Sequence, residues 1–260
     1  MSNERALVTC AALVAVASAC DREVFIGAEV RPDDAPDASA DADLPDAAEF
    51  PWSAQHEGGD LAEWSRVTGP VEGGAYGPSI IAVTNERAHG GNHAVKISIT
   101  LDGRSIRYGK LYREGPMPTR ARFSAWFYLP TPVEIPGFLN LVHFANPVVM
   151  LWDASLSLRN GRPELYLWNH VTDKAFFQVA PSRSVPIGRW FEVAILLERT
   201  SAGSRLQLFQ DGERLVEIPD SGIQPQEILH FNVGVAANDV SPSPLVLYVD
   251  DVAITPLPDP

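Results

Sequence analysis

Short runs of strictly alternating apolar and polar residues recur from Phe50 onward, and they constrain the fold more than any other feature. In residues 121–129, ARFSAWFYL, alanine, phenylalanine and leucine alternate with arginine, serine, tryptophan and tyrosine. Alternation with a period of two is typical of β-strands that bury one face. The same pattern returns at residues 94–101, 138–144, 155–159, 164–170, 191–198, 205–210, 231–235 and 245–254.

Turn signals separate these runs. Asn-Gly stands at 160–161, and Asp-Gly stands at 102–103 and 211–212. Such pairs are favoured in tight hairpins because their residues adopt positive φ angles readily. No convincing amphipathic helix pattern occurs in residues 50–260. Roughly a dozen short strands joined by turns predict an all-β fold, a two-sheet antiparallel jelly-roll sandwich.

The N-terminus has the pattern of an export signal. Residues 6–19, ALVTCAALVAVASA, are apolar or small and follow Arg5. The run is short for a membrane span and suits a signal peptide over residues 1–19. Residues 17–20, ASAC, resemble a bacterial lipobox, although Ala17 stands where the pattern usually has leucine. This predicts lipidation of Cys20 and a membrane-anchored lipoprotein in the periplasm or at the outer membrane or cell surface. Ordinary cleavage near Ala19 is the alternative.

Residues 20–49 predict an acidic, disordered tether. They contain ten acidic residues and two arginines, so eight of the thirteen net negative charges lie there. Such a composition cannot bury enough apolar surface to offset chain entropy. Both cysteines, Cys10 and Cys20, precede the domain at residues 50–260. That domain therefore has no intrachain disulfide and depends on a large core or a metal.

Two adjacent aspartates interrupt the strand pattern of residues 247–254, LYVDDVAI. Neighbouring side chains of a strand face opposite sides, so Asp250 or Asp251 points toward the apolar layer. A buried carboxylate needs a paired charge, a hydrogen-bond donor or a metal. Either a cation site or hydrogen bonds to loop amides would satisfy this requirement.

Three segments carry a family resemblance: EGGDLAEW at 57–64, AHGGNHAVKI at 88–97 and LYVDDVAI at 247–254. Together with Gly188-Arg189-Trp190 and the following Asp-Gly hairpin, their order resembles the concanavalin A-like lectin/glucanase superfamily. That superfamily includes LamG-like and polysaccharide-lyase-like jelly rolls. The likeness extends over nearly all of residues 50–256. It implies a structural calcium held by Glu57, backbone near residues 89–92, and Asp250 or Asp251. It implies no organic cofactor.

The catalytic patterns of this superfamily are absent or incomplete. Its glycosidases carry Glu-x-Asp-x-x-Glu, which does not occur here and argues against glycoside hydrolysis. Its alginate-lyase-like branch pairs cationic and amide groups with a histidine or tyrosine. The matching residues for a lyase acting on a uronate glycan are His143, Tyr166, Arg122 and Asn140. His143 shares its alternation phase with Leu139 and Leu141, which favours a histidine at the core edge.

Aromatic and polar residues in the non-core phases favour carbohydrate binding without cleavage. Aromatic rings flanked by polar groups suit the apolar faces and hydroxyls of sugars. The alternative is that these aromatic residues form a second core layer or pair with one another across neighbouring strands. The predicted sugar-binding residues are Arg122, Trp126, Tyr128, Glu164, Tyr166, Trp168 and His170. We expect a monomer that binds a glycan; an adhesive or structural surface module is a third possibility. The acidic domain lacks a basic signature for nucleic acid.

Overall fold

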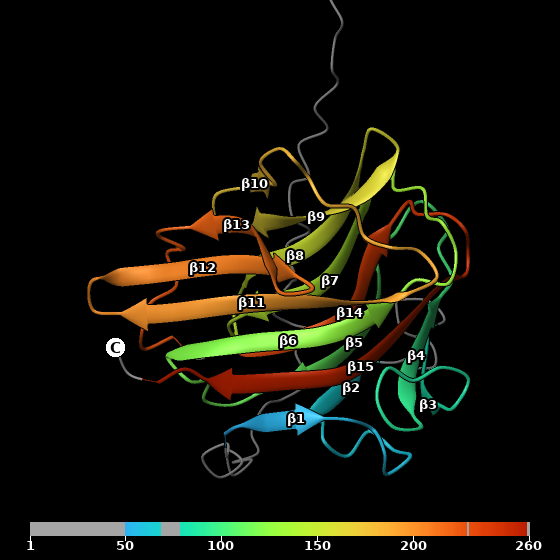
Figure 1. The fold of residues 1–260 in the computed structure, drawn as a ribbon, viewed down its shortest axis with the longest axis horizontal. Helices are drawn as coiled ribbons and strands as arrows, with labels where there is room; N and C mark the ends of the chain where they lie inside the picture. The colour runs from blue at the N-terminus through green and yellow to red at the C-terminus, as the bar shows by residue number, and fades with distance from the viewer. Residues whose placement is uncertain (1–49, 69–78, 228, 259–260) are drawn as a thin grey trace, which may run out of the picture. The chain divides into compact units, whose positions relative to one another are not determined.

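A computed structural model describes residues 50–68, 79–227 and 229–258. These residues form fifteen β-strands and no helix (Figure 1). Within the same residues nothing helical is long and apolar enough to cross a membrane. The predicted signal peptide, Cys20 and the acidic tether lie outside the described residues. The strands are β1 (Trp52–Ala54), β2 (Arg66–Thr68), β3 (Ser79–Thr84), β4 (Ala94–Ile99), β5 (Arg107–Arg113), β6 (Arg120–Tyr128), β7 (Phe138–Ala145), β8 (Met150–Arg159), β9 (Arg162–Asn169), β10 (Lys174–Phe177), β11 (Trp190–Thr200), β12 (Gly203–Gln210), β13 (Glu213–Ile218), β14 (His230–Asn238) and β15 (Leu245–Pro256).

The strands form two antiparallel sheets, which confirms the predicted jelly-roll sandwich. One sheet has eight strands in the order β13-β12-β11-β6-β15-β4-β3, with β1 paired to β15. The other has seven, in the order β10-β9-β8-β7-β14-β5-β2. Trp52 lies opposite Ile254 in the β1–β15 pair, so the first and last strands are neighbours.

The apolar phases of the two sheets meet in one core. The ring of Phe123 in β6 lies edge-on to that of Phe144 in β7, with centroids 4.8 Å apart. Phe231 of β14 packs beside both rings, at 5.2 Å from Phe123 and 5.7 Å from Phe144. All three side chains are buried. Burial of such apolar surface is the main stabilising contribution to a domain without disulfides.

Two of the three predicted hairpin turns are confirmed, whereas Asp102-Gly103 connects β4 of one sheet to β5 of the other and forms no hairpin. Asn160 and Gly161, between β8 and β9, have φ angles of 51° and 72°. Asp211 and Gly212, between β12 and β13, have φ angles of 48° and 79°. The left-handed region at both positions explains why these turns use Asn-Gly and Asp-Gly.

A β-bulge in β7 decides which residues face the core. The register between β7 and β8 shifts between Asn140 and Val142, so Leu141 is the additional residue. Leu141 and Val142 both belong to the apolar core. Asn140 and His143, on either side of them, therefore share the opposite face. The prediction that His143 shares the phase of Leu139 and Leu141 is wrong because strict alternation does not allow for a bulge.

Candidate functional site

The outer face of the seven-stranded sheet carries two rows of adjacent polar and aromatic residues. The strand registers place Trp168, Asp153, His143, Asn232 and Tyr112 opposite one another in sequence across β9, β8, β7, β14 and β5. A second row joins Phe177 of β10, Tyr166, Ser155 and Asn140. We call this surface the polar face.

Asp153 is the hub of hydrogen bonding on the polar face. Its Oδ1 atom lies 2.7 Å from Nδ1 of His143. Its Oδ2 atom accepts from Nδ2 of Asn140 at 2.6 Å and lies 2.6 Å from Nε2 of His170. Ser155 Oγ donates to Asn140 Oδ1 and so fixes the orientation of that amide. Asp153 and His143 have no exposed surface, whereas the His170 side chain is 30% exposed.

Burial and neighbouring polar groups determine the protonation states of Asp153 and His143. Burial alone would raise the pKa of Asp153, but His143 and His170 hold it well below its usual range. Burial lowers the pKa of His143 to about 4, against the opposing effect of Asp153. His143 is therefore neutral at pH 7. Since the carboxylate accepts the proton on Nδ1, the lone pair lies on Nε2, which has no hydrogen-bond partner among the described residues.

Lys110 supplies a positive charge near the same pair. It lies on β5 opposite Gly234 of β14 and is buried. Burial lowers its pKa to about 8, while the charge of Asp153 acts in the opposite direction. Asn232, in the neighbouring row, has a buried Oδ1 atom without a partner among the described residues. The face thus combines a neutral imidazole, a carboxylate, an ammonium group and amides.

The predicted sugar-binding residues do not share one platform. Glu164, Tyr166, Trp168 and His170 lie on or beside β9 in the seven-stranded sheet, but Arg122, Trp126 and Tyr128 lie on β6 in the other sheet. The prediction that these strands share a sheet is wrong. Alternation gives the phase of each strand, but it does not assign a strand to a sheet.

The residues on β6 make other contacts. Arg122 Nη2 donates to Glu192 Oε1 at 2.7 Å. The ring of Trp126 stacks on His89 with centroids 3.7 Å apart, and Tyr128 packs against Trp190. Arg122 therefore does not join His143, Tyr166 and Asn140, as the predicted lyase set required.

Asp153 was missed as a functional residue. The run assigned to its strand began at Ser155, because the preceding residues 150–154, MLWDA, are mostly apolar. In the structure β8 begins at Met150, and Asp153 shares the outward phase with Ser155 and Ser157. One signal in the sequence could have identified Asp153 as an outward-facing residue of this strand. It is the single carboxylate in an apolar run, and it stands two residues before Ser155.

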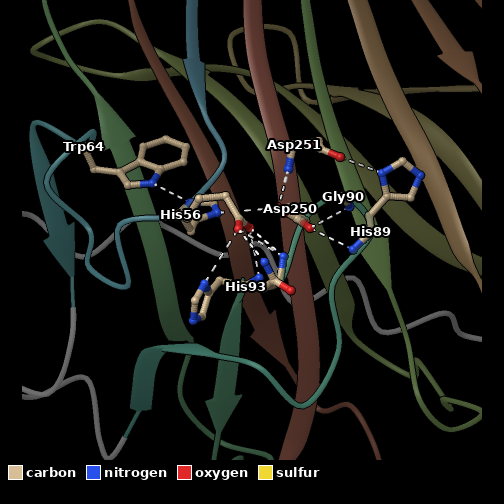
Figure 2. Close-up of polar contacts among 9 residues, drawn as sticks. His56, Trp64, His89, Gly90, His93, Asp250 and Asp251 are labelled. Carbon is tan, nitrogen blue, oxygen red and sulfur yellow. Dashed lines mark hydrogen bonds and ion pairs between the residues drawn. The ribbon is translucent and has the colours of Figure 1, made fainter.

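Glu57, Asp250 and Asp251 form a separate group that joins the two ends of the domain to the turn at residues 89–93. We call this group the clasp. Figure 2 shows Asp250 and Asp251 beside His89 and Gly90 of that turn. Asp250 Oδ2 accepts from the backbone N–H groups of His89 and Gly90, at 2.7 and 3.2 Å. Its Oδ1 atom accepts from Asp251 N at 2.8 Å and lies 3.7 Å from His56 Nδ1. Asp250 is thus the buried aspartate expected from the pattern.

The other two carboxylates are occupied in the same way. Glu57 Oε1 accepts from the backbone N–H groups of Asn92 and His93 at 2.9 and 3.0 Å, which lowers the pKa of Glu57. Asp251 Oδ2 lies 2.7 Å from Nδ1 of His89. Gly91, between the two segments that carry these N–H groups, has a φ of 59°. This left-handed backbone conformation favours glycine at the turn.

This donor arrangement does not fit a calcium ion. Calcium binds six to eight oxygens, whereas the clasp directs backbone and side-chain N–H groups at its carboxylates. Within the residues that the structure describes, no three histidine, cysteine or acidic side chains are grouped so as to hold a metal. Calcium at Glu57, Asp250 and Asp251 remains a prediction of the family resemblance.

Comparison with known proteins supports the fold. No protein-family model matches the sequence. No curated protein matches it either. An endo-β-1,4-glucuronan lyase from the fungus Trichoderma reesei superposes with a TM-score of 0.59 at 13% identity, covering 79% of this chain and 95% of that one. Cellulose induced protein Cip1 gives a TM-score of 0.57 at 13% identity, with coverages of 78% and 96%.

The chain has a concanavalin A-like fold.

Its concanavalin A-like domain is also similar to a structure from work on endo-acting O-glycanases of human gut bacteria, with a TM-score of 0.51, 11% identity and coverages of 82% and 95%. These three proteins have different names but share one fold. At such identities the likeness concerns the fold alone, so the chemistry has to be argued from the polar face.

Proposed function

We propose that the polar face binds a uronate-containing polysaccharide and cleaves it by β-elimination. The observation that carries this proposal is the buried Asp153–His143 pair, whose Nε2 atom has no partner among the described residues and lies on the same face as a buried lysine. A lyase requires a base for the proton beside the uronate carboxylate, a group that neutralises that carboxylate, and an acid for the leaving oxygen.

His143 is the base in this proposal. Its low pKa keeps Nε2 unprotonated at neutral pH, and Asp153 holds the ring in that tautomer. Asp153 then stabilises the imidazolium that forms when Nε2 takes the C5 proton. Asn140 and His170 donate to the other carboxylate oxygen and keep the carboxylate in place.

Lys110 and Tyr166 complete the set. Lys110 offsets the negative charge that develops on the uronate carboxylate as the C5 proton leaves. Burial raises the pKa of Tyr166, which keeps its hydroxyl protonated. As the bond between C4 and the glycosidic oxygen breaks, Tyr166 donates its proton to that oxygen, and the electron pair of the C5–H bond forms the C4=C5 double bond. Solvent returns a proton to Tyr166 and removes one from His143.

Glycan binding without cleavage is the second candidate, and the burial of His143 favours it. Because His143 and Asp153 have no exposed surface, a polymer reaches Nε2 only if side chains over the face move. In this case Tyr166 and Trp168, which are partly exposed, provide contacts for sugar rings. The two candidates share the face and differ only in the reaction.

The experiment mixes the domain with β-1,4-glucuronan and, as a control, with a neutral β-1,4-glucan of similar length. We expect ultraviolet absorbance from the unsaturated uronate with the first polymer only. His143→Gln and Tyr166→Phe should each reduce the rate at least roughly 100-fold. Tyr248→Phe removes a hydroxyl from the opposite sheet and should leave the rate within about two-fold of wild type, since it is remote from the site.

Binding of glucuronan without absorbance would support the second candidate and overturn cleavage of this polymer. Absence of both binding and cleavage would contradict the proposed function for this polymer class. Equal losses in Tyr166→Phe and Tyr248→Phe would show that the variants act through stability rather than chemistry.

The lipid anchor is a separate proposal, supported only by residues 6–20. Export followed by lipidation of Cys20 places the domain at the end of an acidic tether on a membrane. Cys20→Ala should release the exported protein from the membrane fraction, and retention in that fraction would contradict the anchor.

A further inference from the structure

The polar face continues to the edge of its sheet, where Phe177 stands on the last strand, β10. Phe177 is 45% exposed, whereas every other phenylalanine, tyrosine and tryptophan of the described residues is buried or half-buried. The neighbouring Phe176 points the other way and packs on Trp152, with ring centroids 5.5 Å apart. Alternation along β10 therefore directs Phe177 to the polar face.

Phe177 is held between two partners on that face. Its ring stacks on Tyr166 with centroids 5.0 Å apart and an interplanar angle of 28°. The guanidinium carbon of Arg159 lies 5.1 Å from the Phe177 centroid. Arg159 also donates to the backbone oxygen of Gln178 at 3.4 Å. The result is a fixed aromatic surface with an adjacent cation.

This surface is continuous with the proposed reaction site. The register joins Phe177 to Tyr166, Ser155 and Asn140 in one row. Three strand spacings separate β10 from β7, a distance of roughly 14 Å at the usual spacing. One sugar unit cannot reach from His143 to Phe177, but an extended polymer can.

We propose that Phe177 and Arg159 form a subsite for a further sugar ring of the polysaccharide, next to Tyr166 and one strand beyond it. The exposed face of Phe177 packs on the C–H groups of one ring, and Arg159 contacts its hydroxyl or carboxylate oxygens. The subsite rests on the proposed function of the polar face. It makes binding depend on chain length, because a disaccharide placed at His143 and Tyr166 ends one strand before β10.

The test compares wild type with Phe177→Ala on long glucuronan and on the glucuronan disaccharide, the short oligosaccharide, using calorimetric affinity and, where cleavage occurs, KM. The variant should bind the long polymer roughly five-fold more weakly, the effect of losing one aromatic contact. Its affinity for the oligosaccharide should stay within about two-fold of wild type. Phe177→Trp should keep the preference for the long polymer, since it retains an aromatic face.

Val179→Ser is the matched control, because Val179 is 83% exposed on the same segment and has no ring. It should bind both ligands like wild type. Equal affinity of wild type and Phe177→Ala for the long polymer would overturn the subsite while leaving the proposed function intact. Equal weakening on both ligands would also overturn it, because the effect would not depend on length. Failure of wild type to bind or cleave any glucuronan would overturn both proposals.

Discussion

Nδ1 of His143 lies 2.7 Å from Oδ1 of Asp153, and neither side chain has any exposed surface. The pair occupies the face of the seven-stranded sheet that is turned away from the apolar core. A buried charge requires compensation, and here two histidines and an amide provide it. The arrangement places the proton of His143 on Nδ1 and leaves Nε2 without a partner among the described residues.

The pH dependence of activity should be bell-shaped. His143 must be neutral, so kcat/KM should fall as the pH drops through about 4, where burial places its pKa. Lys110 must be charged, so kcat/KM should fall again as the pH rises through about 8. Initial rates on glucuronan from pH 3 to about 10 would measure both limbs. In Lys110→Arg the upper limb should disappear, and a wild-type rate that stays constant to about pH 10 would contradict the role of Lys110.

Removing the charge of Asp153 should destabilise the domain. Asn at this position cannot accept hydrogen bonds from His143, Asn140 and His170 together. Breaking such a buried network costs about 3–5 kcal/mol in free energy of unfolding, measured by urea denaturation. Asp173→Asn, at an exposed turn position, is the control and should change that free energy by less than about 0.5 kcal/mol. Similar losses of unfolding free energy in Asp153→Asn and Asp173→Asn would contradict a stabilising role for the hydrogen-bond network of Asp153.

Stability itself should depend on pH through His143. Its pKa is 6.5 in an unfolded chain and about 4 in the folded domain. Between these values the unfolded chain binds more protons, so the free energy of unfolding should decrease as the pH falls from about 6.5 to about 4. Melting temperatures over this range would show the slope. His143→Gln should reduce it, and an unchanged slope in that variant would assign the effect to other groups.

The two aspartates of the clasp should differ in importance. Asp250 is buried and accepts three backbone N–H groups, whereas Asp251 is partly exposed and contacts His89. Asp250→Asn leaves at least one buried N–H group without a good acceptor, which costs about 1–3 kcal/mol. Asp251→Asn keeps a residue type that tolerates its φ of 43° and should cost less than about 1 kcal/mol. Urea denaturation measures both free energies of unfolding. A larger loss in Asp251→Asn than in Asp250→Asn would contradict the assignment of Asp250 as the buried carboxylate.

Chelation tests the calcium prediction directly. Because the clasp carboxylates already accept N–H groups, we expect EDTA to leave the melting temperature unchanged and added calcium to produce no binding heat. Loss of stability in EDTA, restored by calcium but not by magnesium, would instead support a structural calcium held by Glu57, Asp250 and Asp251.

The sequence was sufficient for the fold class, and the reason is physical. Strand period, turn chemistry and the lack of a helical pattern all specify the same architecture. Strands with charged or short patterns were not recognised. Residues 107–113, RYGKLYR, do not alternate strictly between apolar and polar residues, so the pattern predicts no strand there, yet they form β5 and place Lys110 on the polar face.

The site was predictable only in part. His143, Tyr166 and Asn140 were proposed together and share one face, but Arg122 belongs to the opposite sheet. Two kinds of information were missing from the pattern: the bulge at Leu141 and the assignment of strands to sheets. Both depend on contacts between distant segments, which local alternation does not encode.

The positions of β14 and β15 have a consequence for how the domain acquires its structure. β15 lies between β6 and β4, and β14 lies between β7 and β5. Without residues 230–256, the eight-stranded sheet separates into β13-β12-β11-β6, β4-β3 and an unpaired β1, and the seven-stranded sheet separates into β10-β9-β8-β7 and β5-β2. A nascent chain can therefore join these fragments only after residues 230–256 have emerged from the ribosome. Completion of both sheets is a late, long-range event, and shorter nascent chains expose unpaired strand edges until it occurs.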